Sequence, residues 1–156
     1  MSKNKNQDRL MLAVVVIVAA GLFYVFGPVS KKNTVADPNN NQQVAMGQSA
    51  YRNNCASCHG MRLEGQPNWR KRNPDGTLPA PPHDETGHTW HHPDKLLIDI
   101  TKRGGAAMAP ENFKSAMPGF GAVMSDEQIW AVLAYIKSRW PADVLARQNR
   151  ISQQGK

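Results

Sequence analysis

The feature that most constrains this 156-residue chain is one short stretch, Cys55-Ala56-Ser57-Cys58-His59. It holds both cysteines of the chain, two residues apart, with a histidine directly after the second. On a helical turn this spacing presents two thiols to one edge of a flat macrocycle, where they can form thioether bonds. The adjacent imidazole then supplies a ligand for the central metal. C-x-x-C-H is the attachment signature of haem c. We therefore expect one covalent haem, bound by Cys55 and Cys58.

Two other uses of a C-x-x-C pair stay open on the residues alone. A redox dithiol of the thioredoxin kind is expected within a βαβ pattern, and the sequence shows none. A zinc site usually draws on a second cysteine pair, which a chain with two cysteines does not have. The motif therefore favours haem attachment over a dithiol or a metal site.

The sequence resembles the class I, monohaem c-type cytochromes over roughly residues 44–140. The matching segments are Gly47 to Tyr51, Asn54 to Gly60, Met117 to Phe120 and an amphipathic helix near the C-terminus. The resemblance implies an all-α domain of about three to five helices around one haem c, with His59 and Met117 as the axial ligands of the iron. Residues 61–92 are polar and proline-rich, and they depart from the short members of the family.

The choice of Met117 is made among three methionines. Pro118 forces an extended backbone at Met117, and an extended methionine followed by Gly119-Phe120 is the ligand pattern of the family that the chain resembles. Met108 matches this pattern less well. Met124 comes just before a helix cap, where methionine is usually a filler of the core. We expect Met117 to be the distal ligand, with Met108 as the next candidate.

Three helices of the domain are predicted from spacing and end signals. Val44, Gly47 and Tyr51 share one face of a helix over residues 44–54 that ends at the haem motif. Gly47 costs this helix about 1 kcal/mol relative to alanine, so we expect it at a close helix contact, and the resemblance implies that the partner is the last helix. Proline and two glycines bound a second helix over 93–103. The capping box Ser125 to Gln128 starts a third, which Pro141 ends.

The polar loop between the first two helices holds further candidate ligands. The resemblance implies that a proline carbonyl accepts the Nδ1–H of His59, and the spacing does not choose between Pro81 and Pro82. Four histidines follow in this region: His83, His88, His91 and His92. We expect them to bond to haem propionates or water, while a second metal or an axial histidine stays an alternative.

The N-terminal part of the chain predicts a membrane anchor over residues 10–29. Leu10 to Phe26 carries no charge, and the segment through residue 29 reaches about 30 Å as a helix. A cleaved signal peptide is the alternative, although its apolar core is usually shorter. We expect residues 1–9 in the cytoplasm and 30–43 as a flexible linker to the domain 44–140. Residues 141–156 are then a polar tail, either a short helix or disordered.

The net charge of +7 bears on the choice of partners. Basic chains often bind nucleic acid, but no nucleic-acid motif appears here. An anionic membrane surface and redox partner proteins with acidic docking faces fit better.

The resemblance implies an electron carrier of a respiratory chain and not an enzyme. The domain would lie on the periplasmic side of a bacterial inner membrane, held there by one membrane span. A cytochrome c subunit of a larger respiratory oxidase or reductase complex, and a ligand-binding haem sensor, are the alternative functions.

Overall fold

In the computed structural model, residues 35–108 and 110–155 are described. The predicted cytoplasmic segment 1–9 and the predicted anchor 10–29 lie outside these residues. Among the residues that are described, no helix is both long and apolar enough to cross a membrane.

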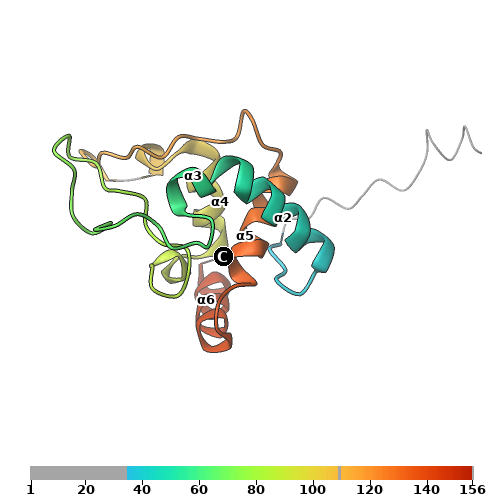
Figure 1. Cartoon of the computed structure of the whole chain (residues 1–156). Helices are drawn as coiled ribbons and strands as arrows, with labels where there is room; N and C mark the ends of the chain where they lie inside the picture. The colour runs from blue at the N-terminus through green and yellow to red at the C-terminus, as the bar shows by residue number, and fades with distance from the viewer. Residues whose placement is uncertain (1–34, 109, 156) are drawn as a thin grey trace, which may run out of the picture. The chain divides into compact units, whose positions relative to one another are not determined.

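The described part of the chain contains five α-helices and two short 3-10 helices, joined by loops, and no strand (Figure 1). The α-helices are α2 (Asn41–Asn54), α3 (Ala56–His59), α4 (Asp94–Arg103), α5 (Asp126–Lys137) and α6 (Ala142–Gln154). The 3-10 helices are η1 (Thr89–His91) and η2 (Ala106–Met108). The expectation of an all-α domain is confirmed for these residues.

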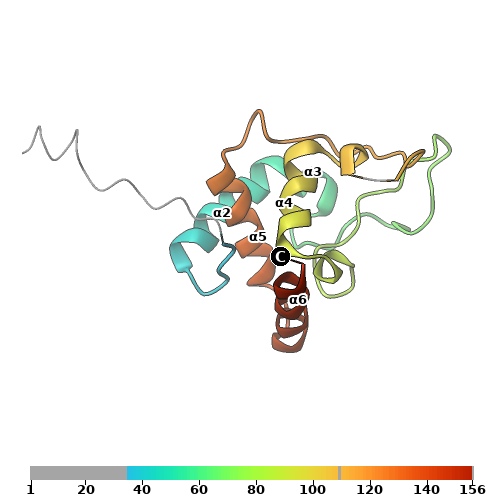
Figure 2. The same cartoon turned by 180° about the vertical axis from the view of Figure 1, so that it is seen from behind.

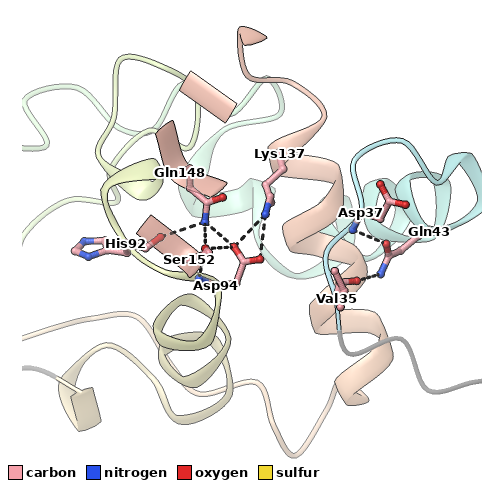
Figure 3. A network of polar contacts seen from close by, with 8 residues as sticks. All are labelled: Val35, Asp37, Gln43, His92, Asp94, Lys137, Gln148 and Ser152. Carbon is pink, nitrogen blue, oxygen red and sulfur yellow. Dashed lines mark hydrogen bonds and ion pairs between the residues drawn. The ribbon is translucent and has the colours of Figure 1, made fainter. Parts of the chain in front are cut away.

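Helix α2 begins inside the stretch 30–43 that we predicted to be a linker. The side chain of Asn40 caps it by accepting a hydrogen bond from the backbone N–H of Gln43. The buried amide of Gln43 in turn binds Val35 and Asp37 of the preceding segment (Figure 3). These bonds order a polar stretch that has little apolar surface of its own to bury.

Helices α2 and α5 cross at Gly47, as predicted. A Cβ atom on this residue would overlap the carbonyl oxygen of Ala131 and reach the Cβ of Tyr135. The capping box of α5 is also present, with Ser125 and Gln128 bonding reciprocally. The core around this crossing includes the buried side chains of Tyr51, Leu63, Met124, Ile129, Val132, Leu133, Ile136 and Trp140. Met124 therefore fills the core, as expected.

Helix α6 makes up most of the tail 141–156 and follows α5 (Figure 2), with Pro141 directly before its first residue. Its buried Gln148 donates hydrogen bonds to the carboxylate of Asp94 at 2.5 Å and to the carbonyl of His92 at 3.2 Å. Ser152 and the buried ammonium of Lys137 also bind Asp94 (Figure 3). One carboxylate at the start of α4 thus connects three helices.

Candidate functional site

The cysteine motif lies where α2 passes into α3. Cys55 closes α2 through a 2.8 Å bond from its N–H to the carbonyl of Tyr51, and it also precedes the first residue of α3. Cys58 lies within α3 and is exposed, while Cys55 is partly buried. Gly60 ends the turn with a φ of 82°, which favours glycine. Both thiols are free and belong to one helical turn.

The environment of the thiols argues against a redox dithiol. Burial, and secondarily the neighbouring Cys58, raises the pKa of Cys55 to about 11. A reactive dithiol works through a thiolate whose pKa is lowered, not raised. Cys55 is therefore a neutral thiol at pH 7, unlike the attacking cysteine of a redox dithiol.

His59 is the last residue of α3, and its side chain is buried. Its Nδ1 lies 2.9 Å from the carbonyl oxygen of Pro81. A carbonyl only accepts, so Nδ1 carries the proton and Nε2 keeps its lone pair. Burial lowers the pKa of His59, and the bond to Pro81 opposes this in part. The result is a neutral imidazole with one nitrogen able to bind a metal. Of the two prolines that the sequence left open, Pro81 makes the bond.

Backbone hydrogen bonds hold the segment around Pro81 against the segment that follows His59. The carbonyl of His59 accepts from Gly65 at 2.8 Å, and the carbonyl of Leu63 accepts from His83 at 2.8 Å. The hydroxyl of Tyr51 donates to the carbonyl of Gly60 at 2.9 Å. The bond between Leu63 and His83 ties the chain two residues after Pro81 to the segment after His59, and so helps to hold the acceptor of the Nδ1 bond in place.

Met117 lies on the loop between η2 and α5, against the C-terminal end of α4. Its carbonyl accepts a bond from Gly105 at 3.1 Å, and its N–H donates to the hydroxyl of Ser115 at 3.2 Å. The next residues continue this attachment, because Phe120 donates to the carbonyl of Thr101 at 2.9 Å. The backbone at Met117 is thus well anchored. Its role as the distal ligand stays a prediction.

The four histidines of the polar loop each contact another ring. His88 stacks on Trp69 and meets His92 edge-on, while His91 stacks on Trp90. Within residues 35–108 and 110–155, no three His, Cys, Asp or Glu side chains form a group that could hold a metal ion. That these histidines bond to haem propionates or to water stays a prediction.

His83 is one of the four candidate histidines named from the sequence, but its contact with His59 was not predicted. Its ring stacks on that of His59, with 4.0 Å between the centroids and 23° between the planes. His83 follows Pro81, the proline that binds His59, by two residues, which could have indicated a place near His59. The sequence did not decide between Pro81 and Pro82, so this distance along the chain could not be used.

The donors present fit a covalent haem c. Two free thiols lie on one helical turn, and the imidazole that follows them is neutral with Nε2 available. A thioether-forming pair next to a nitrogen ligand is the donor set that haem c requires. The raised pKa of Cys55 fits a structural thiol better than a reactive dithiol.

Comparisons with known proteins agree with this site. The family model described as cytochrome c matches residues 44–140. The chain is also 30% identical over 128 residues to the Cbb3-type cytochrome c oxidase subunit FixP of Sinorhizobium medicae (strain WSM419). That alignment covers 81% of this chain and 40% of FixP, so the chain spans less than half of that relative. No solved structure matches the chain. The chain belongs to the cytochrome c family, as a class I c-type cytochrome with one covalent haem c.

Proposed function

We propose that this protein carries single electrons between redox partners of a respiratory chain. Cys55 and Cys58 bind the haem, and His59 and Met117 are the two axial ligands of its iron. The observation that carries the proposal is the bond from His59 Nδ1 to the carbonyl of Pro81 beside two free thiols. When bound, haem c supplies an iron that changes between the ferrous and ferric states.

The residues of the chain prepare this chemistry by orientation. The carbonyl of Pro81 holds the proton of His59 on Nδ1, which directs the lone pair of Nε2 to the metal and raises its basicity. The thioether of Met117 is a soft ligand that favours the ferrous state and raises the potential. With both axial positions taken by protein, no position is left for a substrate, so we propose a carrier and not an enzyme.

A second candidate is a cytochrome c subunit of a larger respiratory oxidase complex. The observation that favours it is the similarity to FixP, which is named as a subunit of such an oxidase. The site would do the same chemistry in either case. The two candidates differ in whether the protein copurifies with a larger membrane protein in a fixed ratio.

The layout of the whole chain belongs to the same proposal. Residues 10–29 would anchor the protein in a bacterial inner membrane, with residues 1–9 in the cytoplasm. Residues 30–43 would connect this anchor to the haem domain on the periplasmic side. The uncharged run from Leu10 to Phe26 supports the anchor. The net charge of +7 supports partners with acidic docking faces. Recovery of the chain in the membrane fraction after a high-salt wash would test the anchor.

A redox titration of the holoprotein, followed by its optical spectrum, tests the proposed function. We expect one transition with a one-electron slope of about 59 mV per tenfold change in the ratio of oxidised to reduced protein. We also expect that carbon monoxide leaves the reduced spectrum unchanged, because Met117 occupies the sixth position. Rapid binding of carbon monoxide to the reduced protein would contradict the carrier and favour a ligand-binding haem sensor.

A further inference from the structure

We propose that His83 is a positioning residue for His59, fixing the rotation of the His59 ring by lying flat against one of its faces. This inference rests on the proposed function, in which His59 binds the haem iron. It assigns a role to a histidine of the polar loop that the site chemistry does not otherwise use.

The bond to Pro81 by itself leaves the His59 ring one freedom. A single N–H···O bond holds one edge of an imidazole and tolerates bending by about 30°, so the ring can still pivot to that extent about its Cβ–Cγ bond. A flat group in contact with a face of the ring blocks this pivot. The ring of His83 is such a group, with its centroid 4.0 Å from that of His59 and its plane within 23°. The edge contact and the face contact together define the plane of His59.

His83 can act in this way because its own position is fixed. Its backbone N–H donates to the carbonyl of Leu63 at 2.8 Å, and its carbonyl accepts from the indole of Trp140 at 2.7 Å. Its Nδ1 pairs with the hydroxyl of buried Thr89 at 2.8 Å. Tyr51, which is fully buried, meets the His83 ring edge-on at 6.2 Å. Backbone bonds therefore fix the main chain of His83, and Thr89 fixes the rotation of its ring.

The C-terminal helix supports this arrangement through η1, the 3-10 helix that carries Thr89. The side chain of Gln148 on α6 donates to the carbonyl of His92, which follows η1. The guanidinium of Arg147 lies 4.8 Å from the ring centroid of Trp90, within η1. Helix α6 lies beyond the residues 44–140 that match the family. Helix α6 thus stabilises the position of η1, and η1 in turn positions His83 through the hydroxyl of Thr89.

The stacking of His83 on His59 disfavours His83 as the second ligand of the iron, an alternative that the sequence left open. Axial ligands approach an iron from opposite sides, each with a nitrogen or sulfur directed at the metal. Two imidazoles stacked face to face lie beside each other on one side. His83 is therefore placed to orient the ligand His59 and not to replace Met117.

Proton NMR of the oxidised holoprotein tests the inference, because the plane of an axial imidazole determines how unpaired spin is distributed over the haem methyl groups. His83→Leu fills the site without a flat face, and we expect it to lose the wild-type pattern of methyl shifts. His83→Phe keeps a flat ring, and we expect it to retain that pattern. His91→Leu is the control for a change at η1 that does not touch the two rings, because His91 ends η1, is exposed and stacks on Trp90.

Thr89→Val removes the hydroxyl that fixes the His83 ring, without touching His59. We expect it to shift the methyl pattern in the wild-type background and to add nothing in the His83→Phe background, since phenylalanine has no group for Thr89 to bind. This non-additivity separates a contact through His83 from a general loosening of the loop. It also keeps the inference testable if His83→Leu gives no folded holoprotein.

The outcomes distinguish the inference from the proposed function. If the wild type is low-spin and His83→Leu keeps its methyl pattern, the positioning role is wrong and the proposed function stands. Equal effects of Thr89→Val with and without His83→Phe would also overturn the positioning role. If the wild type binds no covalent haem, or its ferric iron is high-spin, the proposed function is wrong and the inference falls with it.

Discussion

Gly47 of α2 lies directly against the main-chain carbonyl of Ala131 on α5, with no room for a side chain between the two helices. The contact explains why a residue that weakens an isolated helix occupies the middle of α2. The helix loses about 1 kcal/mol of propensity. The close approach of the two backbones lets Tyr51 on α2 and Ile129 on α5 be fully buried.

Replacing Gly47 by alanine should destabilise the holoprotein by about 2 kcal/mol or more. The added methyl group meets backbone, which cannot rotate away, so α2 and α5 must separate. Denaturant unfolding followed by the haem absorption measures the free energy of unfolding. Ser49→Ala, at an exposed position of the same helix, is the control and should change it by less than about 0.5 kcal/mol. A Gly47→Ala protein as stable as the wild type would contradict the close crossing.

Replacing Lys137 by methionine should cost about 3–5 kcal/mol of unfolding free energy. The side chain of Lys137 is 97% buried, and its ammonium binds both carboxylate oxygens of Asp94, at 3.0 and 3.1 Å. Its removal leaves a largely buried carboxylate without its counter-charge. The same unfolding experiment measures this effect.

The ion pair of Lys102 and Asp126 is the matched control, since it has a distance of 2.8 Å but side chains that are 35% and 41% exposed. Lys102→Met should change stability by no more than about 1 kcal/mol. Similar losses of unfolding free energy in Lys137→Met and Lys102→Met would show that burial does not determine how much an ion pair contributes to stability.

The stability of the folded domain should fall as the pH drops below about 6.5, in part because of His88. Partial desolvation, followed by the charges of His92, His91 and Arg70, lowers the pKa of the exposed His88 from its ordinary value of 6.5. A lowered pKa in the folded state means that the unfolded chain binds the proton more readily. The contribution of His88 is therefore present above pH 6.5 and is lost as the pH falls through the folded-state pKa.

The variant His88→Phe keeps a ring to stack on Trp69 and removes the titrating group. Unfolding curves between pH 8 and pH 5 should show a shallower decline for this variant than for the wild type. The difference at pH 8, where the histidine is neutral in both states, measures packing alone and serves as the internal control. Parallel pH profiles would show that His88 does not contribute to the decline.

The parts of the fold that sequence patterns predicted are those governed by local signals. The capping box before Asp126, the glycine at the helix crossing and the core position of Met124 all follow from residues close together in the chain. The haem motif is equally local, because its spacing fits one helical turn. These signals need no knowledge of distant segments.

The parts that the sequence left open or did not predict depend on distant contacts. Helix α6 has few apolar residues, and it is held by bonds from Gln148 and Ser152 to Asp94, more than fifty residues earlier in the chain. The stacking of His83 on His59 likewise depends on how the loop folds back past Leu63. Periodicity within one segment carries no information about such contacts.

Replacing Met117 by alanine should open the sixth position of the iron. We expect the loss of the weak charge-transfer band between methionine sulfur and ferric iron, a lower potential, and binding of carbon monoxide to the reduced protein. Met108→Leu is the control, because Met108 lies on η2 and was the second candidate. Loss of the band in Met108→Leu, with the band intact in Met117→Ala, would exchange the roles of the two methionines.

The optical spectrum of the purified holoprotein, oxidised and reduced, tests the central claim most directly. The protein should be expressed with the haem-attachment machinery, and its haem should stay bound after denaturation and extraction with acidic solvent. The account predicts a low-spin c-type spectrum with the methionine charge-transfer band in the oxidised form. A high-spin spectrum would contradict ligation by both His59 and Met117. Release of the haem on extraction would contradict covalent attachment to Cys55 and Cys58.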